Sequence, residues 1–328
     1  MTAKKTFQVV LSVAIALFFL WLILRRISLE QIKHAFDGAS LIWILAALVA
    51  FAIGYSCRIE RCRLMLERDN PRLKWRSCAG PLLASFAVNN ILPFRAGDVL
   101  RSFAFNRRLG TTTGVMVATL FVERLLDLLM VLVLLSVTLA FFDMEASRFA
   151  GVGSMVLTFG ATAILVVLLF PGVFASLAQS VGRLAARLSP RVGQKLHDEI
   201  SKGLDTLQYL AKGNTMIGLI AWSVMAWLAE GCVFWFSALA LPSIAAPLAG
   251  WLALPVGTLA TLIPSTPGYV GTFDYFTVHA MTELGNTFKA ATAYTLLVHV
   301  LLWLPPTLVG GLYLLLHPVK QQEKLKAI

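Results

Sequence analysis

Long apolar runs alternate with short polar segments along most of the chain, and each run approaches the roughly 20 residues that a helix needs to cross a bilayer. Six runs have this character, at residues 7–24, 41–57, 113–142, 152–170, 216–241 and 288–316. Two shorter apolar stretches, 78–93 and 248–264, end in sequence that contains proline and glycine. The pattern predicts an all-α polytopic membrane protein with six full spans and two re-entrant or broken helical segments.

Lys and Arg are concentrated in residues 58–76, in residues 171–215 and in the tail after residue 316. Cytoplasmic loops of membrane proteins carry such an excess of basic residues. If the six long runs cross the membrane and the two short stretches do not, all three basic segments lie on the cytoplasmic side. The exception is the pair Arg25 and Arg26, which this arrangement places on the external side of the membrane. The expected location is the bacterial inner (cytoplasmic) membrane, with cytoplasmic N- and C-termini.

The basic segment 171–215 also carries an apolar stripe. Its apolar residues recur every three or four positions, with polar and charged residues between them, which is the period of an amphipathic helix. These residues are Val192, Leu196, Ile200, Leu204 and Leu207. The predicted helix packs either on the protein's own loops or on the membrane surface.

These features divide the chain into four parts. They are an N-terminal span and external loop (1–40), a first half (41–170) with the broken segment 78–101, a cytoplasmic amphipathic helical loop (171–215), and a second half (216–328) with the broken segment 248–274.

The two broken segments share a local pattern. Each has two aliphatic residues before a proline, Pro93 or Pro264, and a glycine, Gly97 or Gly268, four positions later. Proline lacks an amide donor and ends a helix, and glycine permits the reversal that follows. The backbone groups left unpaired survive at membrane depth only inside protein or beside a wet cavity.

Three long runs separate the two broken segments. Three crossings make the segments enter from opposite faces, which predicts an inverted pseudo-repeat of the kind found in transporters, with the substrate site between the broken elements. The alternative is that proline and glycine mark ordinary loops.

Charged residues interrupt two of the apolar runs. The run 113–142 contains Glu123, Arg124 and Asp127, and the run 216–241 contains Glu230. Each charge costs roughly 3 kcal/mol at membrane depth unless it is paired or hydrated. We expect all four to face the bundle interior, and the first three to meet Arg95, Asp98 or Arg101. They form either an ion-pair network that fixes packing or a polar site for a charged headgroup.

The expected site combines these charges with the broken segments. Its residues are Asn89, Asn90, Pro93, Arg95, Gly97, Asp98, Arg101, Glu123, Arg124, Asp127, Glu230, Pro264, Pro267, Gly268, Gly271 and Asp274. Arginine suits bidentate contact with phosphate. His299, alone in the last run, is expected to be a packed, hydrogen-bonded side chain.

Composition supports a membrane protein rather than a soluble one. Hydrophobic residues make up 58% of the chain and charged residues 14%, against roughly 25% charged in a soluble domain. The net charge of +11 follows the membrane topology, so we expect anionic lipid headgroups and no nucleic acid as partners. The four cysteines match no zinc or redox motif, and we expect no cofactor and no metal.

At these residues the chain resembles the transmembrane region of lysylphosphatidylglycerol synthases, also called the flippase-like or UPF0104 family. The first motif runs from Asn90 through Arg95 to Arg101, the second from Glu123 to Asp127, and the third from Ile263 to Asp274. Family members often carry Glu where this chain has Asp98 and Asp274, and a second Gly where it has Tyr269. The resemblance implies movement of an amphipathic lipid between leaflets.

Because the sequence ends soon after the last run, we expect the translocating part without a synthase domain, and no enzymatic activity. The expected function is a lipid translocase for an anionic phospholipid, an aminoacyl-phospholipid or a polyprenyl phosphate, with a homo-oligomer left open. The alternatives are a membrane enzyme acting on a lipid-linked substrate and a non-transporting scaffold. No nucleotide-binding loop is present in the sequence, so we expect no direct use of ATP.

Overall fold

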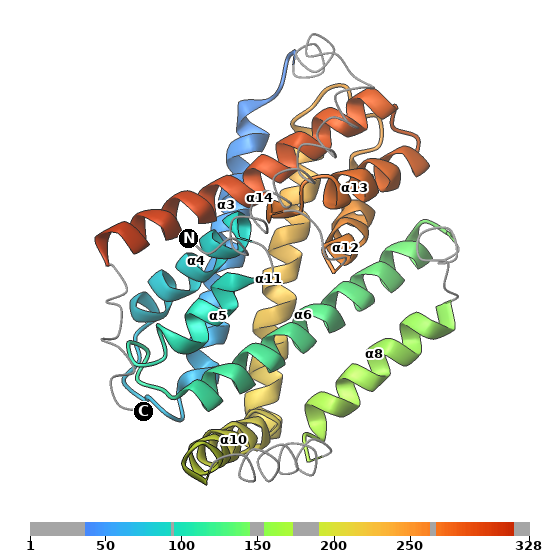
Figure 1. Ribbon diagram of the computed structural model, residues 1–328. Helices are drawn as coiled ribbons and strands as arrows, with labels where there is room; N and C mark the ends of the chain where they lie inside the picture. The colour runs from blue at the N-terminus through green and yellow to red at the C-terminus, as the bar shows by residue number, and fades with distance from the viewer. Residues whose placement is uncertain (1–36, 93–94, 145–153, 173–189, 263–266, 318–328) are drawn as a thin grey trace, which may run out of the picture.

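The computed structural model describes residues 37–92, 95–144, 154–172, 190–262 and 267–317 of the chain (Figure 1). These residues form ten α-helices and two 3₁₀ turns, and this part of the chain contains no strand. The helices long and apolar enough to cross a membrane are α3 (Leu41–Leu66), α6 (Thr113–Phe141), α11 (Gly213–Leu239) and α14 (Phe288–Leu316). The prediction of an all-helical membrane protein is therefore confirmed.

The remaining predicted spans are shorter or lie elsewhere. The run 152–170 corresponds to α8 (Ser154–Leu169), which is apolar but has only 16 residues. The run 7–24 lies outside the described residues. Four candidate spans are thus present in the described part, where six were predicted for the whole chain.

Helix α3 corrects one predicted boundary. It continues nine residues past Cys57, to Leu66, so Arg58 and Arg61 belong to the helix and not to a basic loop. Both side chains are buried. The apolar run stops at Arg58, but the helix does not, because neighbouring helices supply acidic partners for both arginines.

The first broken segment is a helical hairpin. Helix α4 (Trp75–Ile91) ends two residues before Pro93, which lies outside the described residues, and α5 (Ala96–Phe103) begins after Arg95 in left-handed conformation at φ 51°. Gly97 lets α5 fold closely onto α4, since a Cβ atom there would collide with the carbonyl of Ser85.

The second broken segment is also a helical hairpin. After a 3₁₀ turn, η1 (Pro247–Ala249), helix α12 (Gly250–Ala260) runs towards Pro264, which lies outside the described residues. A second turn, η2 (Pro267–Tyr269), leads into α13 (Thr272–Glu283), with Gly268 and Gly271 at φ 67° and 93°. Helices α12 and α13 pack against each other.

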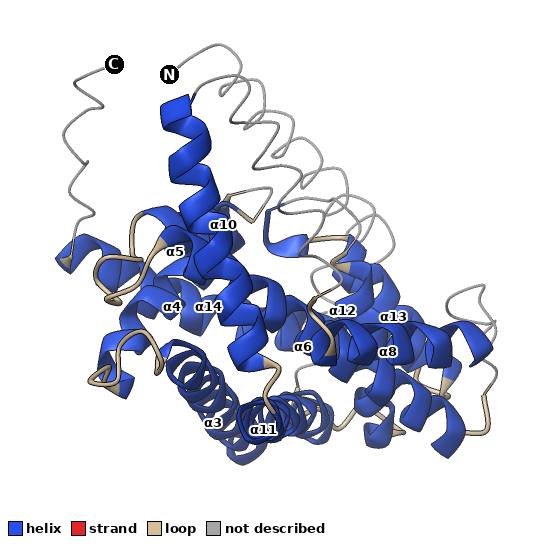
Figure 2. Ribbon diagram, turned by 90° about the horizontal axis from the view of Figure 1, so that it is seen from below, coloured by secondary structure: helices blue, strands red, loops and turns tan. Residues whose placement is uncertain are grey.

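The helices form two sets, α3 to α6 and α11 to α14, each with a long helix, a hairpin and a second long helix. Helices α3 and α11 lie side by side along one edge of the bundle (Figure 2). Helix α4 of the first set packs on α14 of the second, and α12 of the second packs on α6 of the first. Each hairpin therefore contacts the last long helix of the other set.

The predicted amphipathic helix is confirmed as α10 (Pro190–Leu210). It packs on the start of α6, where the amide of Gly114 donates to the carboxylate of Glu199 at 2.5 Å. Arg68 donates to the carbonyl of Asp205 at 2.9 Å, and Asn70 donates to that of Leu109 at 3.0 Å. The loops that follow α3 and α5 therefore lie at the same end of the molecule as α10.

Two adjacent glycines of α14 give a test of the α4–α14 contact. A Cβ atom at Gly310 would collide with the carbonyl of Leu83 on α4, whereas one at Gly311 would meet open space. Gly310→Ala should therefore lower the free energy of unfolding by about 1–3 kcal/mol through overpacking. Gly311→Ala should leave stability unchanged or raise it slightly, because alanine favours the helix. Thermal unfolding in detergent measures both, and equal melting temperatures would contradict the packing described.

Candidate functional site

A cavity of about 380 Å³ lies between the two hairpins and the long helices α3, α6, α11 and α14. Seven of the sequence-predicted site residues line it: Asn89, Asn90, Arg95, Arg124, Asp127, Glu230 and Gly268. Aromatic and aliphatic side chains, among them Phe86, Leu128 and Trp303, complete the wall. Both broken segments and several of the buried charges therefore contribute side chains to the wall of one cavity.

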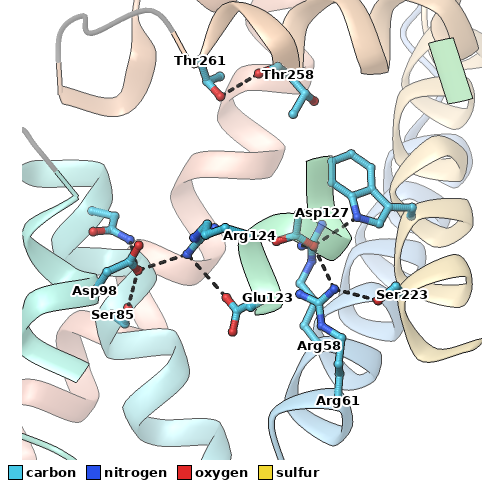
Figure 3. Close-up of polar contacts among 12 residues, drawn as sticks. Arg58, Arg61, Ser85, Asp98, Glu123, Arg124, Asp127, Ser223, Thr258 and Thr261 are labelled. Atoms are coloured by element: carbon cyan, nitrogen blue, oxygen red, sulfur yellow. Dashed lines mark hydrogen bonds and ion pairs between the residues drawn. The ribbon is translucent and has the colours of Figure 1, made fainter. Parts of the chain in front are cut away.

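Arg124 connects the charges on α6 to the first hairpin (Figure 3). Its Nη2 atom lies 3.1 Å from Asp98 and 3.4 Å from Glu123, and its Nη1 atom lies 3.7 Å from Asp127. The buried Nε atom has no hydrogen-bond partner. The side chain is 31% exposed and lines the cavity, so this guanidinium group can contact a ligand without leaving its carboxylate partners.

Arg101 and Glu123 form a buried ion pair behind the cavity wall. The Nη2 atom of Arg101 donates to both carboxylate oxygens of Glu123 at 2.9 Å, and the two side chains are 2% and 3% exposed. Neither residue lines the cavity. This contact between α5 and α6 confirms the prediction that charged residues of α6 meet residues of the first broken segment.

Asp127 faces α3 and α11 (Figure 3). It accepts from Arg61 Nη1 at 2.8 Å and from Trp227 Nε1 at 3.3 Å, and Arg61 also donates to Ser223 Oγ at 2.9 Å. Arg58 lies 3.7 Å from the same carboxylate. A charge on α6 is thus neutralised by arginines of α3.

Arg58 also forms an ion pair with Glu230 of α11. Sequence reasoning expected Glu230 to point inward, which the structure confirms, but it placed Arg58 and Arg61 in a loop. The sequence did contain a chemical indication that Arg58 and Arg61 lie inside the bundle. Glu230 and Asp127 needed cationic partners inside the bundle, and Arg58 and Arg61 follow an apolar run without a helix-breaking residue.

Two asparagines hold the first break. The side-chain oxygen of Asn89 accepts from the amide of Gly97 at 2.8 Å, and its nitrogen donates to Asp98 at 3.0 Å. The Asn90 side chain donates to Thr307 Oγ1 at 2.8 Å and to the carbonyl of Trp303 at 3.2 Å. Asn89 therefore fixes the start of α5, and Asn90 ties the end of α4 to α14.

The second break is held by Asp274 and His299. One carboxylate oxygen of Asp274 accepts from the amide of Gly271 at 2.8 Å, and the other lies 2.6 Å from His299 Nδ1. His299 Nε2 lies 3.0 Å from the carbonyl of Gly268. The expectation of a packed, hydrogen-bonded histidine is confirmed. The ring also lines the cavity, which places His299 in the site, where sequence reasoning had not put it.

The remaining predicted residues divide into two groups. Pro93 and Pro264 lie outside the described residues, and nothing is described of the Pro267 side chain, although its backbone begins η2. Gly97 and Gly271 shape the starts of α5 and α13. Within the described ranges, no three His, Cys, Asp or Glu side chains gather in a way that could hold a metal ion.

Comparison with known proteins identifies the family. Residues 9–310 match the profile described as the lysylphosphatidylglycerol synthase TM region. This chain belongs to the lysylphosphatidylglycerol synthase transmembrane-region family. It is also similar to a UPF0104 membrane protein of Methanocaldococcus jannaschii, with 24% identity over 230 residues that cover 69% of this chain and 92% of that protein. The resemblance seen in the three sequence motifs is confirmed.

In this family member, the Arg101–Glu123 pair gives a test of the buried charges. Arg101→Met leaves Glu123 buried with only the more distant Arg124 as a partner, and we expect a loss of about 3–5 kcal/mol in unfolding free energy. The double variant Arg101→Met, Glu123→Leu should recover part of that loss. Arg63→Met is the control, because the Arg63–Glu60 pair is partly exposed and contributes about 1 kcal/mol or less. Chemical denaturation in detergent measures all three, and equal losses for Arg101→Met and Arg63→Met would contradict this assignment.

Proposed function

We propose that this protein is a lipid translocase that moves a phosphate-bearing, anionic lipid between the two leaflets of the membrane, without synthase activity of its own. Membership of a family described by the membrane region of a lipid synthase supports a role in lipid handling. The cavity between the two hairpins is the proposed headgroup site. The candidate lipids are an anionic phospholipid, an aminoacyl-phospholipid and a polyprenyl phosphate.

The observation that carries this proposal is an unmatched positive charge in the cavity wall. Apart from the His299–Asp274 pair, the network around the cavity contains five arginines and four carboxylates: Arg58, Arg61, Arg95, Arg101 and Arg124, with Asp98, Glu123, Asp127 and Glu230. Within the described part of the chain, the side chain of Arg95 makes no hydrogen bond or ion pair, and it lines the cavity. Its backbone carbonyl accepts from the amide of Asp98 at 2.9 Å. A phosphate beside Arg95 and the exposed part of the Arg124 side chain would balance this charge.

The size and surroundings of the cavity suit a headgroup rather than a whole lipid. Its volume of about 380 Å³ lies at the lower end of the roughly 300–1,000 Å³ of small-molecule sites. Near the two breaks, Ile91, Leu92 and Leu262 are 54%, 43% and 55% exposed. In a membrane these side chains would face acyl chains, so a lipid could place its phosphate inside while its tails stay in the hydrocarbon.

The membrane arrangement is part of the proposal. The matched packing of α3–α6 and α11–α14 supports an inverted repeat with two re-entrant hairpins, set within six spans. Loops 67–74 and 104–112 and helix α10 share one end of the molecule and carry many of the basic residues. That end would face the cytoplasm of a bacterial inner membrane, with both chain termini on the same side.

Reconstitution tests the function directly. Purified protein in liposomes should move labelled phosphatidylglycerol, an aminoacyl-phospholipid or a polyprenyl phosphate faster than protein-free vesicles do. Folded protein that moves none of these lipids would contradict the translocase proposal. Chemical conversion of a lipid in the same vesicles would instead support a membrane enzyme.

Arg95→Gln tests the headgroup site. The substitution removes the unmatched charge while breaking no described contact, so folding should be preserved. Loss of a hydrogen bond to a charged group, worth about 1.5–3 kcal/mol, should weaken binding of short-chain phosphatidylglycerol roughly 10- to 100-fold and slow its movement. Arg72→Gln, in an exposed loop, is the control. Unchanged affinity in Arg95→Gln would place the phosphate elsewhere.

A further inference from the structure

The two hairpins place chemically related residues at matching positions. Arg124 is the twelfth residue of α6, counted from Thr113, and His299 is the twelfth residue of α14, counted from Phe288. Asp98 and Asp274 are each the third residue of their short helix, α5 and α13. In each set, the third residue of the short helix contacts the twelfth of the long helix that follows.

Helices α3 and α11 also place related residues at matching positions. Arg58 is the eighteenth residue of α3 and Glu230 the eighteenth of α11, and these two side chains form an ion pair with each other. Gly54 of α3 lies against Ala226 of α11, and both are the fourteenth residues of their helices. If a two-fold rotation relates the two sets, residues at its axis have to contact their own counterparts, as Arg58 and Glu230 do. His299–Asp274 is therefore the second-set counterpart of Arg124–Asp98.

The counterparts differ in how their charge is carried. A guanidinium group is permanently charged in proteins, whereas an imidazole gains and loses its proton near neutral pH. The first set therefore holds its positive charge permanently beside the cavity. The second set can hold one only while a proton is bound.

The contacts of His299 define how many protons the pair carries. Nδ1 faces a carboxylate oxygen at 2.6 Å, and Nε2 faces the Gly268 carbonyl at 3.0 Å. A carbonyl oxygen only accepts, so Nε2 must carry a hydrogen. The short Nδ1 contact needs a second proton, carried either by the ring beside ionised Asp274 or by a protonated Asp274. Both arrangements contain the same one exchangeable proton, which the two side chains share.

We infer that His299 and Asp274 form the binding site of a proton that is coupled to lipid movement, an inference that rests on the proposed translocase function. Releasing this proton to water in the cavity leaves ionised Asp274 and a neutral ring with one N–H. That ring can donate to Asp274 or to Gly268, but not to both. Proton loss therefore weakens the tie between α14 and the second break and removes one positive charge from the cavity wall.

Several elements around His299 carry other charged or titratable side chains. Arg58, Arg124, Asp127 and Glu230 of α3, α6 and α11 line the same cavity, as do Tyr55, Arg95 and Tyr269. On α13, Asp274 contacts the ring, and the remaining titratable residues are Tyr275, His279 and Glu283. The lining residues of α4 and α12 carry no ionisable group. Besides contacting Asp274, the His299 ring packs against the Phe273 ring in a T-shaped arrangement, with 5.3 Å between the ring centroids.

The sign of the coupling follows from these charges. With the proton bound, the cavity wall carries its full positive charge and favours an anionic headgroup. Without the proton, the wall carries one positive charge less. Affinity for an anionic headgroup should therefore fall as pH rises through the titration of the pair. By linkage, the lipid should raise the proton affinity in return.

Transport by the full chain in liposomes tests the coupling. For wild-type protein, a pH gradient of one unit should drive labelled phosphatidylglycerol to an imbalance between leaflets of up to about tenfold, if one proton moves with each lipid. His299→Gln should abolish this response. His299→Arg, which imposes a permanent charge, should also lose the response while keeping headgroup affinity at high pH. His279→Gln is the control, since His279 lies 3.8 Å from Glu283 and does not line the cavity.

A second measurement separates this inference from the proposed function. Nitrogen NMR of labelled histidines reports the ring state of His299 in the reconstituted protein, and binding of short-chain phosphatidylglycerol is measured across the same pH range. As pH rises, the His299–Asp274 pair should lose one proton, which is detected as a change in the His299 nitrogen shifts. Lipid affinity should weaken over the same pH range in wild type but not in His299→Gln. If wild type moves no lipid, the translocase proposal fails and these two measurements decide the proton site. Nitrogen shifts of His299 that do not change with pH, or a gradient response retained by His299→Gln, would overturn the proton site while leaving the translocase proposal intact.

Discussion

The structure depends on pairing ionised side chains inside an otherwise apolar helix bundle. An unpaired charge at this depth would cost several kcal/mol, yet Arg61, Arg101 and Glu123 are 2–3% exposed. Each finds a partner on a different helix. The charges therefore do more than neutralise one another, because three of the pairs join different helices. Asp127 joins α6 to α3, Glu230 joins α11 to α3, and Glu123 joins α6 to α5.

The same constraint explains the two breaks. An interrupted helix leaves amide and carbonyl groups without partners, and lipid cannot supply them. Here side chains do. Asn89 accepts from the Gly97 amide, Asp274 accepts from the Gly271 amide, and His299 contacts the Gly268 carbonyl. Two of these three residues also line the cavity. Asn89 and His299 thus both hold the irregular backbone in place and face the cavity.

The matched sets differ where function would require it. In the first set the contact between hairpin and long helix is Arg124–Asp98, which keeps its charge at any physiological pH. In the second set it is His299–Asp274, which we infer to be a proton site. Helices α3 and α11, joined by Arg58 and Glu230, form the part that both sets share. A cavity with one permanent positive charge in its wall and one that depends on a bound proton would suit a carrier that has to bind an anionic headgroup on one side of the membrane and release it on the other.

The sequence alone determined the helical fold, the starts and ends of α6 and α14 to within one residue, both breaks, and the family. These features arise from local chemistry: apolar run length, proline, glycine and short motifs. It also placed Glu123, Arg124 and Asp127 correctly inside the bundle, since a charge in a spanning run has to point inward. Only the tertiary structure placed Arg58 and Arg61 in the interior. An apolar run is counted only up to its first charged residue, and that count takes no account of an acidic partner on another helix. It likewise revealed that His299 meets Asp274, 25 residues away. Partners across helices are set by packing register, which no local pattern in a single sequence contains.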